Sequence, residues 1–249
     1  MKHFICVFIF SILLSTDGYN QSKDTIGINY YFSNGVPVLN KVWMGADYKN
    51  AVVAIKNIAD KDINKLPRKN YGDGKDVFNK IVDINTYEFF DSTYYNKQNQ
   101  YQSAVEALDA IKSLLILYYS NNGTAKTLKY SNELASCSVA ILFLLEKQTN
   151  LVLGIVGDTS KFTTTQKNGY RQFEKGLNTV VSGILTTIEK DYPYYEKNDI
   201  IIIATYFFPY YNRLKKILSQ SSLFEFNRII SDIEKNHPYL EVRALANKL

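Results

Sequence analysis

Histidine is nearly absent from this sequence, which contains only His3 and His237. Zinc hydrolases of the His-Glu-x-x-His type need two histidines one helical turn apart, and the chain has no such pair. Glu234 and His237 have the Glu-x-x-His spacing of di-iron helical bundles, but those bundles require a second such motif and two further glutamates. We therefore predict no metal site and interpret His237 as a helix cap or a surface residue.

Cysteine is equally scarce, since Cys6 and Cys137 are the only two. Cys6 lies in an N-terminal apolar run, so removal of that run would leave Cys137 alone and exclude an intramolecular disulfide. Cys137 stands between two serines in an uncharged segment. We interpret it as a small buried residue rather than a reactive thiol.

Recognised catalytic motifs are missing as well. A Ser-His-Asp triad would have to use His237, and the sequence has no Gly-x-Ser-x-Gly elbow. Gly154 and Gly157 suggest a phosphate loop, but Asp158 follows where a Walker A motif places lysine, and its carboxylate would repel phosphate. We expect no cofactor and favour a non-catalytic protein over an enzyme.

The first twenty residues differ in kind from the rest of the chain. Lys2 precedes a predominantly apolar run, residues 4–14, and polar residues that include the small Ser15, Gly18 and Ser22 follow it. That order is typical of a secretory signal peptide. We predict a signal peptide over residues 1–18, with cleavage between positions 15 and 22, and hence an exported protein of the periplasm or the extracellular space.

The formal net charge of +5 is mild and spread along the chain. Its densest basic cluster consists of Lys65, Arg68 and Lys69. Removal of residues 1–18 takes away one lysine and one aspartate, so the net charge stays the same. Charge of this size on an exported protein argues against nucleic acid as a partner.

An uncharged run, residues 134–145, marks the predicted centre of the fold. About 18 to 20 apolar residues are needed to cross a bilayer, so we predict no transmembrane segment after signal removal. A helix that is apolar on every side is normally buried at the centre of a helical protein. We expect the other helices to cover this one.

Helical periodicity dominates the rest of the chain, because apolar residues recur every three or four positions. No stretch between these segments is rich enough in proline, serine or charge to be a linker between domains, and no fixed-period repeat is present. We therefore predict an all-α protein with a single globular domain of seven or eight helices over residues 46–249. Clear helical segments are residues 48–66, 104–118, 170–188 and 226–233, and residues 77–90 show a weaker helical pattern.

Residues 19–45 are aromatic, polar and rich in turn signals. Asn34-Gly35 is a hairpin signal, residues 28–32 are a candidate strand, and Pro37 would confine a return strand to a sheet edge. We expect an irregular arm or a short hairpin that lies on the helices, with Trp43 holding its end.

Two segments are consistent with either helix or strand. Residues 151–156 form a short apolar stretch interrupted by a glycine, and residues 200–208 begin with four isoleucines, which favour strands. For residues 200–208 we prefer a buried helix that Pro209 bends or breaks. For residues 151–156, length and periodicity do not show whether the segment is a helix or a strand.

Two cap signals stand near the C-terminus. Ser222 with Glu225 has the spacing of a capping box, which predicts that a helix begins at Ser222. Pro238 is suited to the first position of a helix, which predicts a terminal helix that begins there.

Tyrosine is in excess, with 20 among 249 residues, and it occurs five times as an adjacent pair. Neighbouring helical residues point about 100° apart, so one ring of a pair can pack inward while the other lies at the rim. Rim tyrosines are typical of protein interfaces and also suit sugar stacking, although a general bias toward Tyr, Asn, Lys and Ile is an alternative explanation. The residues predicted for a ligand or partner surface are Trp43, Tyr94, Tyr95, Tyr194, Tyr195, Tyr210 and Tyr211.

Three functions remain compatible with the sequence. The first is an exported, non-catalytic helical protein that binds a protein partner, in the manner of an inhibitor or immunity protein. The second is a hydrolase of a glycan or another cell-envelope polymer, which needs two acids facing each other across a cleft. The third is a structural protein of the cell envelope. Candidate acids for the second function are Asp83, Glu88, Asp91, Glu189, Asp191, Glu196 and Asp199.

Overall fold

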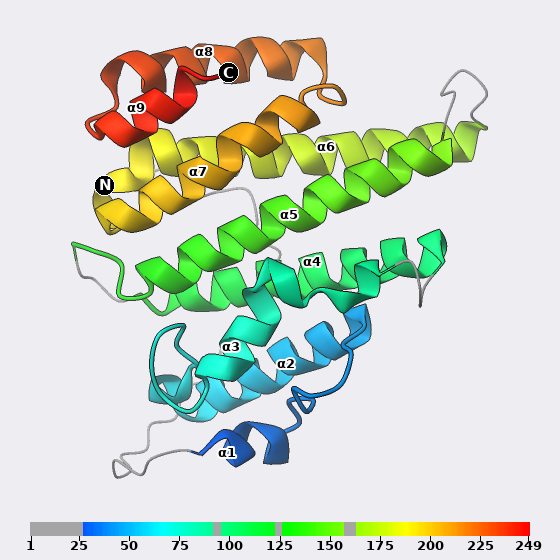
Figure 1. Cartoon of the computed structure of the whole chain (residues 1–249), viewed down its shortest axis with the longest axis vertical. Helices are drawn as coiled ribbons and strands as arrows, with labels where there is room; N and C mark the ends of the chain where they lie inside the picture. Colours follow the sequence, from blue (N-terminus) through cyan, green and yellow to red (C-terminus); the bar gives the residue numbers. More distant parts are fainter. Residues whose placement is uncertain (1–26, 92–95, 123–125, 157–162) are drawn as a thin grey trace.

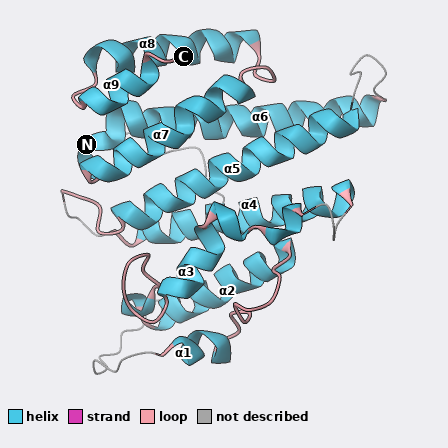
Figure 2. Ribbon diagram, viewed as in Figure 1, coloured by secondary structure: helices cyan, strands magenta, loops and turns pink. Residues whose placement is uncertain are grey.

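The computed structural model of the chain describes residues 27–91, 96–122, 126–156 and 163–249. Every regular element within these ranges is helical, and eight of their nine α-helices have seven residues or more (Figures 1 and 2). The predicted all-α fold is confirmed. The predicted signal peptide lies outside the described residues, as do Tyr94 and Tyr95.

The α-helices are α1 (Ile28–Ser33), α2 (Gly45–Lys61), α3 (Lys75–Val82), α4 (Lys97–Ser120), α5 (Ser131–Val156), α6 (Thr164–Thr186), α7 (Lys197–Leu214), α8 (Gln220–Asn236) and α9 (Leu240–Ala246). Shorter helical turns are η1 (Ile63–Lys65), η2 (Ile84–Thr86), η3 (Glu88–Phe90), η5 (Thr187–Asp191) and η6 (Tyr192–Tyr194).

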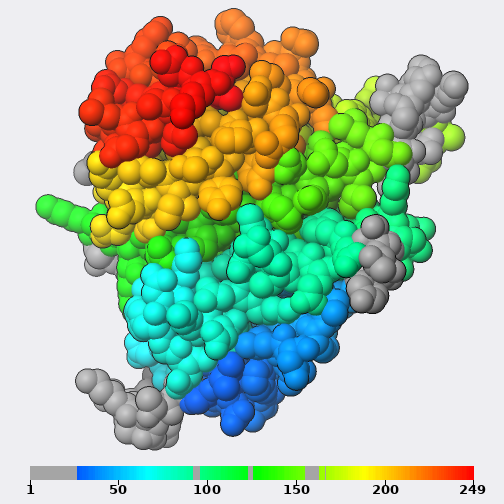
Figure 3. All heavy atoms as spheres, in the orientation of Figure 1, coloured from blue at the N-terminus to red at the C-terminus, as the bar shows by residue number. Residues whose placement is uncertain are grey.

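The helices are stacked in an order close to that of the sequence, so the colours form successive bands in the space-filling view (Figures 1 and 3). α2 packs on α4, α4 on α5, α5 on α7, and α7 on α9, which also packs on α8. α6 lies behind α7 in Figure 1 and contacts both α7 and α8. α5 therefore occupies the middle of the stack.

The apolar run of residues 134–145 lies within α5, and its side chains are buried except for that of Phe143, which is half-buried. Among the described residues, α5 is the one helix long and apolar enough to cross a membrane by length and composition, over Ser131–Gly154. In this fold α4 and α7 pack against it, and 56% of its most apolar window is buried. α5 therefore serves as the core helix. Residues 151–156 are its last turns.

The N-terminal arm differs from the prediction, because residues 28–33 form helix α1 where a strand was expected. The ring of Tyr31 packs into the core, and its hydroxyl donates a hydrogen bond to the Lys65 carbonyl at 3.0 Å. Gly35 has φ +99°, and its N–H bonds back to the Phe32 carbonyl at 3.1 Å. The Asn34-Gly35 turn signal is real, but it ends a helix instead of joining two strands.

Trp43 holds the end of the arm, as predicted. Its side chain is fully buried, and its indole N–H donates to the Val38 carbonyl at 2.9 Å. Its ring packs edge-on against Tyr48, with centroids 5.2 Å apart. The arm is therefore anchored to the first residues of α2 by aromatic packing.

The segment of residues 77–90 is not one helix, since α3 ends at Val82 and two 3₁₀ turns, η2 and η3, follow. Asp83 Oδ1 accepts the Asn85 backbone N–H at 2.9 Å. The Thr86 hydroxyl donates to the Lys80 and Asp83 carbonyls at 3.0 and 2.8 Å. Such local side-chain bonds compete with the helical ladder, so the helix ends there.

Residues 200–208 are helical, as preferred, but α7 also continues through Pro209 to Leu214. Proline cannot donate to the carbonyl four residues earlier, which belongs to Thr205. Both residues lie on the exposed side of α7, where water can bond that carbonyl. Of the two predicted effects of Pro209, a bend or a break, the break is therefore wrong.

Both predicted C-terminal caps are displaced. α8 begins after Ser219, whose hydroxyl oxygen accepts the Ser222 N–H at 3.2 Å, so Ser222 lies inside the helix. α9 begins at Leu240 with Tyr239 as its N-cap, so Pro238 precedes the helix instead of opening it. The helices exist where expected, and only the positions of their first residues change.

Candidate functional site

The structure separates the residues predicted for a partner surface. Trp43, Tyr210 and Tyr211 are buried in the hydrophobic core, so their rings cannot form part of an exposed surface. Tyr194 is 54% exposed, and Tyr195 beside it is half-buried. Among the described members of the predicted set, Tyr194 alone offers an exposed ring.

The expected division of a tyrosine pair between core and rim depends on where its helix lies. In α4, Tyr118 is fully buried while Tyr119 is 41% exposed. In α7, both Tyr210 and Tyr211 are buried, and Tyr211 packs edge-on against Phe226 of α8 and donates a hydrogen bond to Asn227 Oδ1 at 2.9 Å. An adjacent pair of tyrosines therefore predicts an exposed ring only on a helix that has one face open to solvent.

Tyr194 belongs to an unusual connection between α6 and α7. A π-helical turn, η5 (Thr187–Asp191), widens the end of α6, and the 3₁₀ turn η6 (Tyr192–Tyr194) follows directly. Pro193 has no N–H and so cannot continue the helical ladder. Single π turns are rare and frequently lie at functional sites. We call η5 and η6 together, residues 187–194, the π connection.

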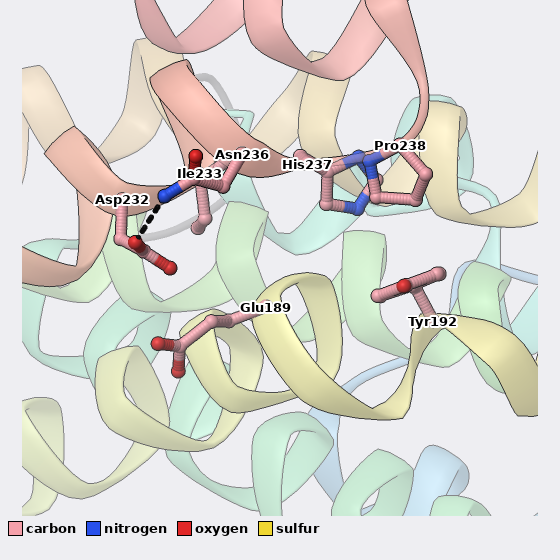
Figure 4. Close-up of a pocket in the computed structure, with 7 residues that line it drawn as sticks. All are labelled: Glu189, Tyr192, Asp232, Ile233, Asn236, His237 and Pro238. Atoms are coloured by element: carbon pink, nitrogen blue, oxygen red, sulfur yellow. Dashed lines mark hydrogen bonds between the residues drawn. The ribbon is translucent and has the colours of Figure 1, made fainter.

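A hollow of about 90 Å³ lies between the π connection and the end of α8 (Figure 4). Figure 4 shows Glu189 and Asp232 toward one end of this hollow and Tyr192 and His237 at the other. The Asn236 side-chain amide donates to Asp232 Oδ1 at 2.7 Å, which fixes the orientation of both groups. The hollow is lined by Glu189, Tyr192, Asp232, Ile233, Asn236, His237 and Pro238.

His237 joins the two walls of the hollow. Its Nδ1 accepts the Tyr239 backbone N–H at 3.1 Å, so Nε2 must carry the proton that bonds the Ile188 carbonyl at 3.0 Å. The prediction of a cap is confirmed, since His237 follows the last residue of α8, but the side chain is buried, not on the surface. Burial lowers the pKa of His237, and the positive charge of Arg243 lowers it further, whereas its two backbone hydrogen bonds act in the opposite direction.

Glu189 is the least satisfied group of the hollow. Its Oε2 atom is buried and accepts no hydrogen bond from the described residues. The Lys190 ammonium approaches that oxygen to 3.5 Å, but the Lys190 side chain is 68% exposed and therefore well hydrated. A buried carboxylate oxygen without a hydrogen bond is costly, and the ion pair with the hydrated Lys190 ammonium offsets only part of that cost.

On the same connection, Asp191 lies close to a group of tyrosines. Burial raises the pKa of the Asp191 carboxyl, and the neighbouring Lys190 partly offsets this. Burial also raises the pKa of the Tyr119 hydroxyl, and Asp191 and Tyr194 raise it further. Since Tyr119 and Tyr194 are both exposed, these residues form a partly dehydrated acidic and aromatic surface. We call Tyr119, Asp191 and Tyr194 the tyrosine ledge.

The remaining buried carboxylates have structural roles. Asp199 accepts hydrogen bonds from the Ser131 hydroxyl at 2.6 Å and the Asn132 amide at 3.0 Å. Ser131 Oγ accepts the Glu196 N–H at 3.0 Å, so this network joins the first turns of α5 and α7. Glu133 Oε1 accepts Arg68 Nε at 3.0 Å and a backbone N–H at 2.9 Å.

The other candidate acids are not brought together. Asp83 caps the turn η2, Glu88 lies 3.4 Å from Lys80, and Glu196 is exposed at the start of α7. No three histidine, cysteine, aspartate or glutamate side chains among the described residues are grouped so that they could hold a metal ion. Cys137 is buried in the core, which raises the pKa of its thiol.

No protein-family model, curated protein or solved structure matches this chain. Its function is therefore inferred from geometry. Sequence reasoning found Tyr194 and named Glu189 and Asp191 among the candidate acids, but it missed the hollow. The available signal was the i, i+4 pair of Asp232 and Asn236, one turn before the end of α8.

Proposed function

We propose that this chain is an exported, non-catalytic helical protein that binds a protein partner through the tyrosine ledge and the adjoining hollow. The observation that carries the proposal is the 54% exposed ring of Tyr194 on a well-anchored backbone. The Tyr194 carbonyl accepts the Leu128 N–H at 2.7 Å, and the Tyr195 N–H bonds the Tyr192 carbonyl at 3.2 Å. Rigid tyrosines at such positions are frequent hot spots of protein interfaces.

Asp191 supports the same proposal. Its carboxylate is partly dehydrated and lies close to Tyr119, so a basic residue on a partner could pair with it without removing much further water. Charge complementarity of this kind contributes more to specificity and association rate than to raw affinity. An inhibitor or immunity protein needs that combination, because it must select one partner quickly.

The hydrolase alternative is less well supported. Glu189 and Asp232 do line one hollow, but its volume of about 90 Å³ is well below the roughly 300–1,000 Å³ of typical ligand pockets. A hollow of this size suits one small chemical group, such as the end of a side chain on a larger partner. The third alternative, a structural protein, would self-associate in solution at its working concentration.

A photo-crosslinking amino acid at position 194 tests the proposal in cells that produce the full chain. Position 224 is the matched control, because Phe224 is also aromatic and is 77% exposed at the start of α8. We expect one discrete crosslinked protein from position 194 and none from position 224. Equal products at both positions, or none at position 194, would contradict the proposal. The N-terminal residue of the recovered chain tests export, since it should lie between positions 16 and 23.

A further inference from the structure

The ring of His237 connects three helical elements near the C-terminus. Its Nε2–H donates to the Ile188 carbonyl of the π connection at 3.0 Å, and its Nδ1 accepts the backbone N–H of Tyr239, the N-cap of α9, at 3.1 Å. His237 itself follows the last residue of α8. We call this buried ring with its two hydrogen bonds the histidine bridge.

The sequence of the π connection explains why its carbonyl needs a donor from another element. In a π turn each carbonyl pairs with the N–H five residues later, which for Ile188 is position 193. Pro193 has no N–H, so the Ile188 carbonyl lacks that partner. His237 supplies a hydrogen in its place. The histidine bridge therefore replaces a bond that the π turn cannot form.

The bridge requires a neutral imidazole. In the neutral ring one nitrogen donates and the other accepts, whereas an imidazolium carries a hydrogen on both nitrogens. Protonation of His237 would leave its bond to the Ile188 carbonyl intact. Nδ1, however, would then present a hydrogen to the Tyr239 N–H, so that two donors face each other. The turn that joins α8 to α9 would have to change its conformation to separate them.

Charged and titratable groups from four elements surround the bridge. They are Glu189 and Tyr192 of the π connection, Asp232 of α8, Tyr239 and Arg243 of α9, and Lys197 of α7, whose ammonium lies 5.6 Å from the Tyr239 ring centroid. Burial of the ring and the positive charge of Arg243 both lower the pKa of His237. Glu189 and Asp232 lie toward the other end of the hollow (Figure 4). A protonated ring would therefore repel Arg243 on α9.

The anchorage of α9 is otherwise light. Its buried side chains are those of Val242 and Ala246. Glu241 pairs with Lys197 of α7 at 2.8 Å, but both side chains are about half exposed, and exposed ion pairs contribute little to stability. Because α9 is the last helix and few of its side chains are buried, it can open without unfolding the other helices.

We propose that the histidine bridge is a pH-operated device, in which protonation of His237 releases α9 from its place on α7 and α8 while the α2–α4–α5–α7 stack stays folded. In neutral medium the bridge is closed. In acidic medium the terminal helix separates and exposes the apolar side chains of Val242 and Ala246. The device does not depend on the function proposed for the tyrosine ledge, because the backbone of Tyr194 is held separately by the Leu128 N–H.

The direction of the pH response follows from the lowered pKa. The open form takes up the proton first, so the closed bridge is fully stable above about pH 6.5 and weakens as the pH falls toward the folded-state pKa of His237. Other carboxyl groups also titrate in acid, since burial raises the pKa of Asp191. A variant that lacks the imidazole is therefore needed to assign the response.

Hydrogen exchange of the full chain, followed by NMR at about pH 7.5 and about pH 5, tests the device. The Val242 and Arg243 amides both donate to the Tyr239 carbonyl. We expect their protection factors to fall at least about threefold at the lower pH, while that of the Leu142 amide in α5 stays the same. His237→Gln keeps a side-chain N–H but cannot be protonated in this range, so its α9 protection should not depend on pH.

Three results would overturn the inference: equal α9 protection at both pH values, an equal fall in His237→Gln, or a parallel fall in α5, which would mean global unfolding. If the variant does not fold, an NMR titration of the His237 ring in the unchanged chain decides. The ring must titrate below its ordinary pKa of 6.5, and the Tyr239 amide signal must follow the same curve. A ring that titrates at or above 6.5, or a Tyr239 amide that does not respond, contradicts the proposal.

Discussion

Helices α5 and α6 are similar in length, but their surroundings differ. α5 is packed between α4 and α7, and nearly every residue of its first half is buried. α6 contacts α7 and α8, and its glycines Gly169, Gly176 and Gly183 lie seven residues apart on an exposed face. A Cβ atom added at any of these three positions would meet nothing within 4 Å.

Two glycines of the first half of the chain, Gly45 and Gly74, lie in a different environment, although Gly27 and Gly72 also have open space around them. A Cβ atom at Gly45 would lie 2.6 Å from the Ser103 carbonyl oxygen, and one at Gly74 would lie 2.5 Å from the Tyr31 hydroxyl. These positions need glycine for close packing, whereas the α6 glycines cost helix stability without an internal packing reason. The comparison indicates that the contact between α2 and α4 and the packing around Gly74 require glycine, whereas the exposed face of α6 does not.

The largest difference in stability should appear when a phenylalanine is truncated in the core helix α7 and at the exposed start of α8. Phe207 in α7 is fully buried, and Phe224 in α8 is 77% exposed. We expect Phe207→Ala to lower the free energy of unfolding by about 3–5 kcal/mol, because it leaves a cavity, and Phe224→Ala to change it by less than about 0.5 kcal/mol. Urea denaturation measures both values. Similar losses would show that the two regions are equally packed.

Overpacking of the central helix α5 should cause the second-largest loss of stability. Cys137 is fully buried in α5, and Cys137→Trp adds a large ring that the surrounding helices cannot accommodate without moving. We expect a loss of about 1–3 kcal/mol or more, seen as a lower midpoint in thermal or chemical denaturation. An unchanged midpoint would mean that α5 is not the centre of the core. Cys137→Ser is the control for loss of the thiol.

Glycine-to-alanine substitutions should change the free energy of unfolding in opposite directions at Gly176 in α6 and at Gly45 in α2. Gly176→Ala on α6 should stabilise the fold by about 0.4–1 kcal/mol, because alanine restricts the unfolded chain and meets no obstacle in the helix. Gly45→Ala should destabilise it, because the new methyl group would overlap the Ser103 carbonyl. Paired urea titrations measure the difference. A loss of stability in Gly176→Ala would mean that this face of α6 is covered in the native protein.

Replacement of His237 should cause the smallest change in the free energy of unfolding, and that change depends on pH. Burial lowers the folded-state pKa of His237 below its ordinary value of 6.5, so the unfolded chain takes up this proton first as the pH falls. The contribution to stability is therefore complete above about pH 6.5 and decreases toward the lower folded-state pKa. We expect His237→Gln to flatten the change in unfolding free energy across this window. An unchanged pH profile would contradict the neutral, buried assignment.

Much of the fold was predictable from the sequence because α-helices leave periodic apolar patterns. The uncharged run of residues 134–145 marked the central helix. Residues 200–208, which begin with four β-branched isoleucines, were correctly preferred as helix in a helical setting. Starts of helices were less predictable, since Ser219 and Ser222 are both suitable caps and tertiary packing selected Ser219. α1 was missed because its six residues carry no amphipathic period.

The candidate site was only partly predictable. Adjacent tyrosines marked Tyr194, but the same pattern also marked Tyr210 and Tyr211, which tertiary packing buries. Glu189 and Asp232 are far apart in the sequence, and their approach depends on a π turn that has no sequence signature. His237 was predicted to be a cap or a surface residue, and only the first alternative is right. Its role in joining α8 to the π connection depends on a hydrogen bond to Ile188 that only the folded structure defines.

The most direct test of the central claim compares two buried carboxylates. Glu189 has a buried oxygen with no hydrogen bond from the described residues, whereas both oxygens of Asp199 accept one. We predict that Glu189→Gln leaves the thermal midpoint unchanged or raises it, because it removes a charge that is poorly compensated, and that Asp199→Asn lowers the midpoint, because it disrupts the network that joins α5 and α7. A Glu189→Gln variant that loses as much stability as Asp199→Asn would contradict the claim that the π connection is less well satisfied than the joint between α5 and α7.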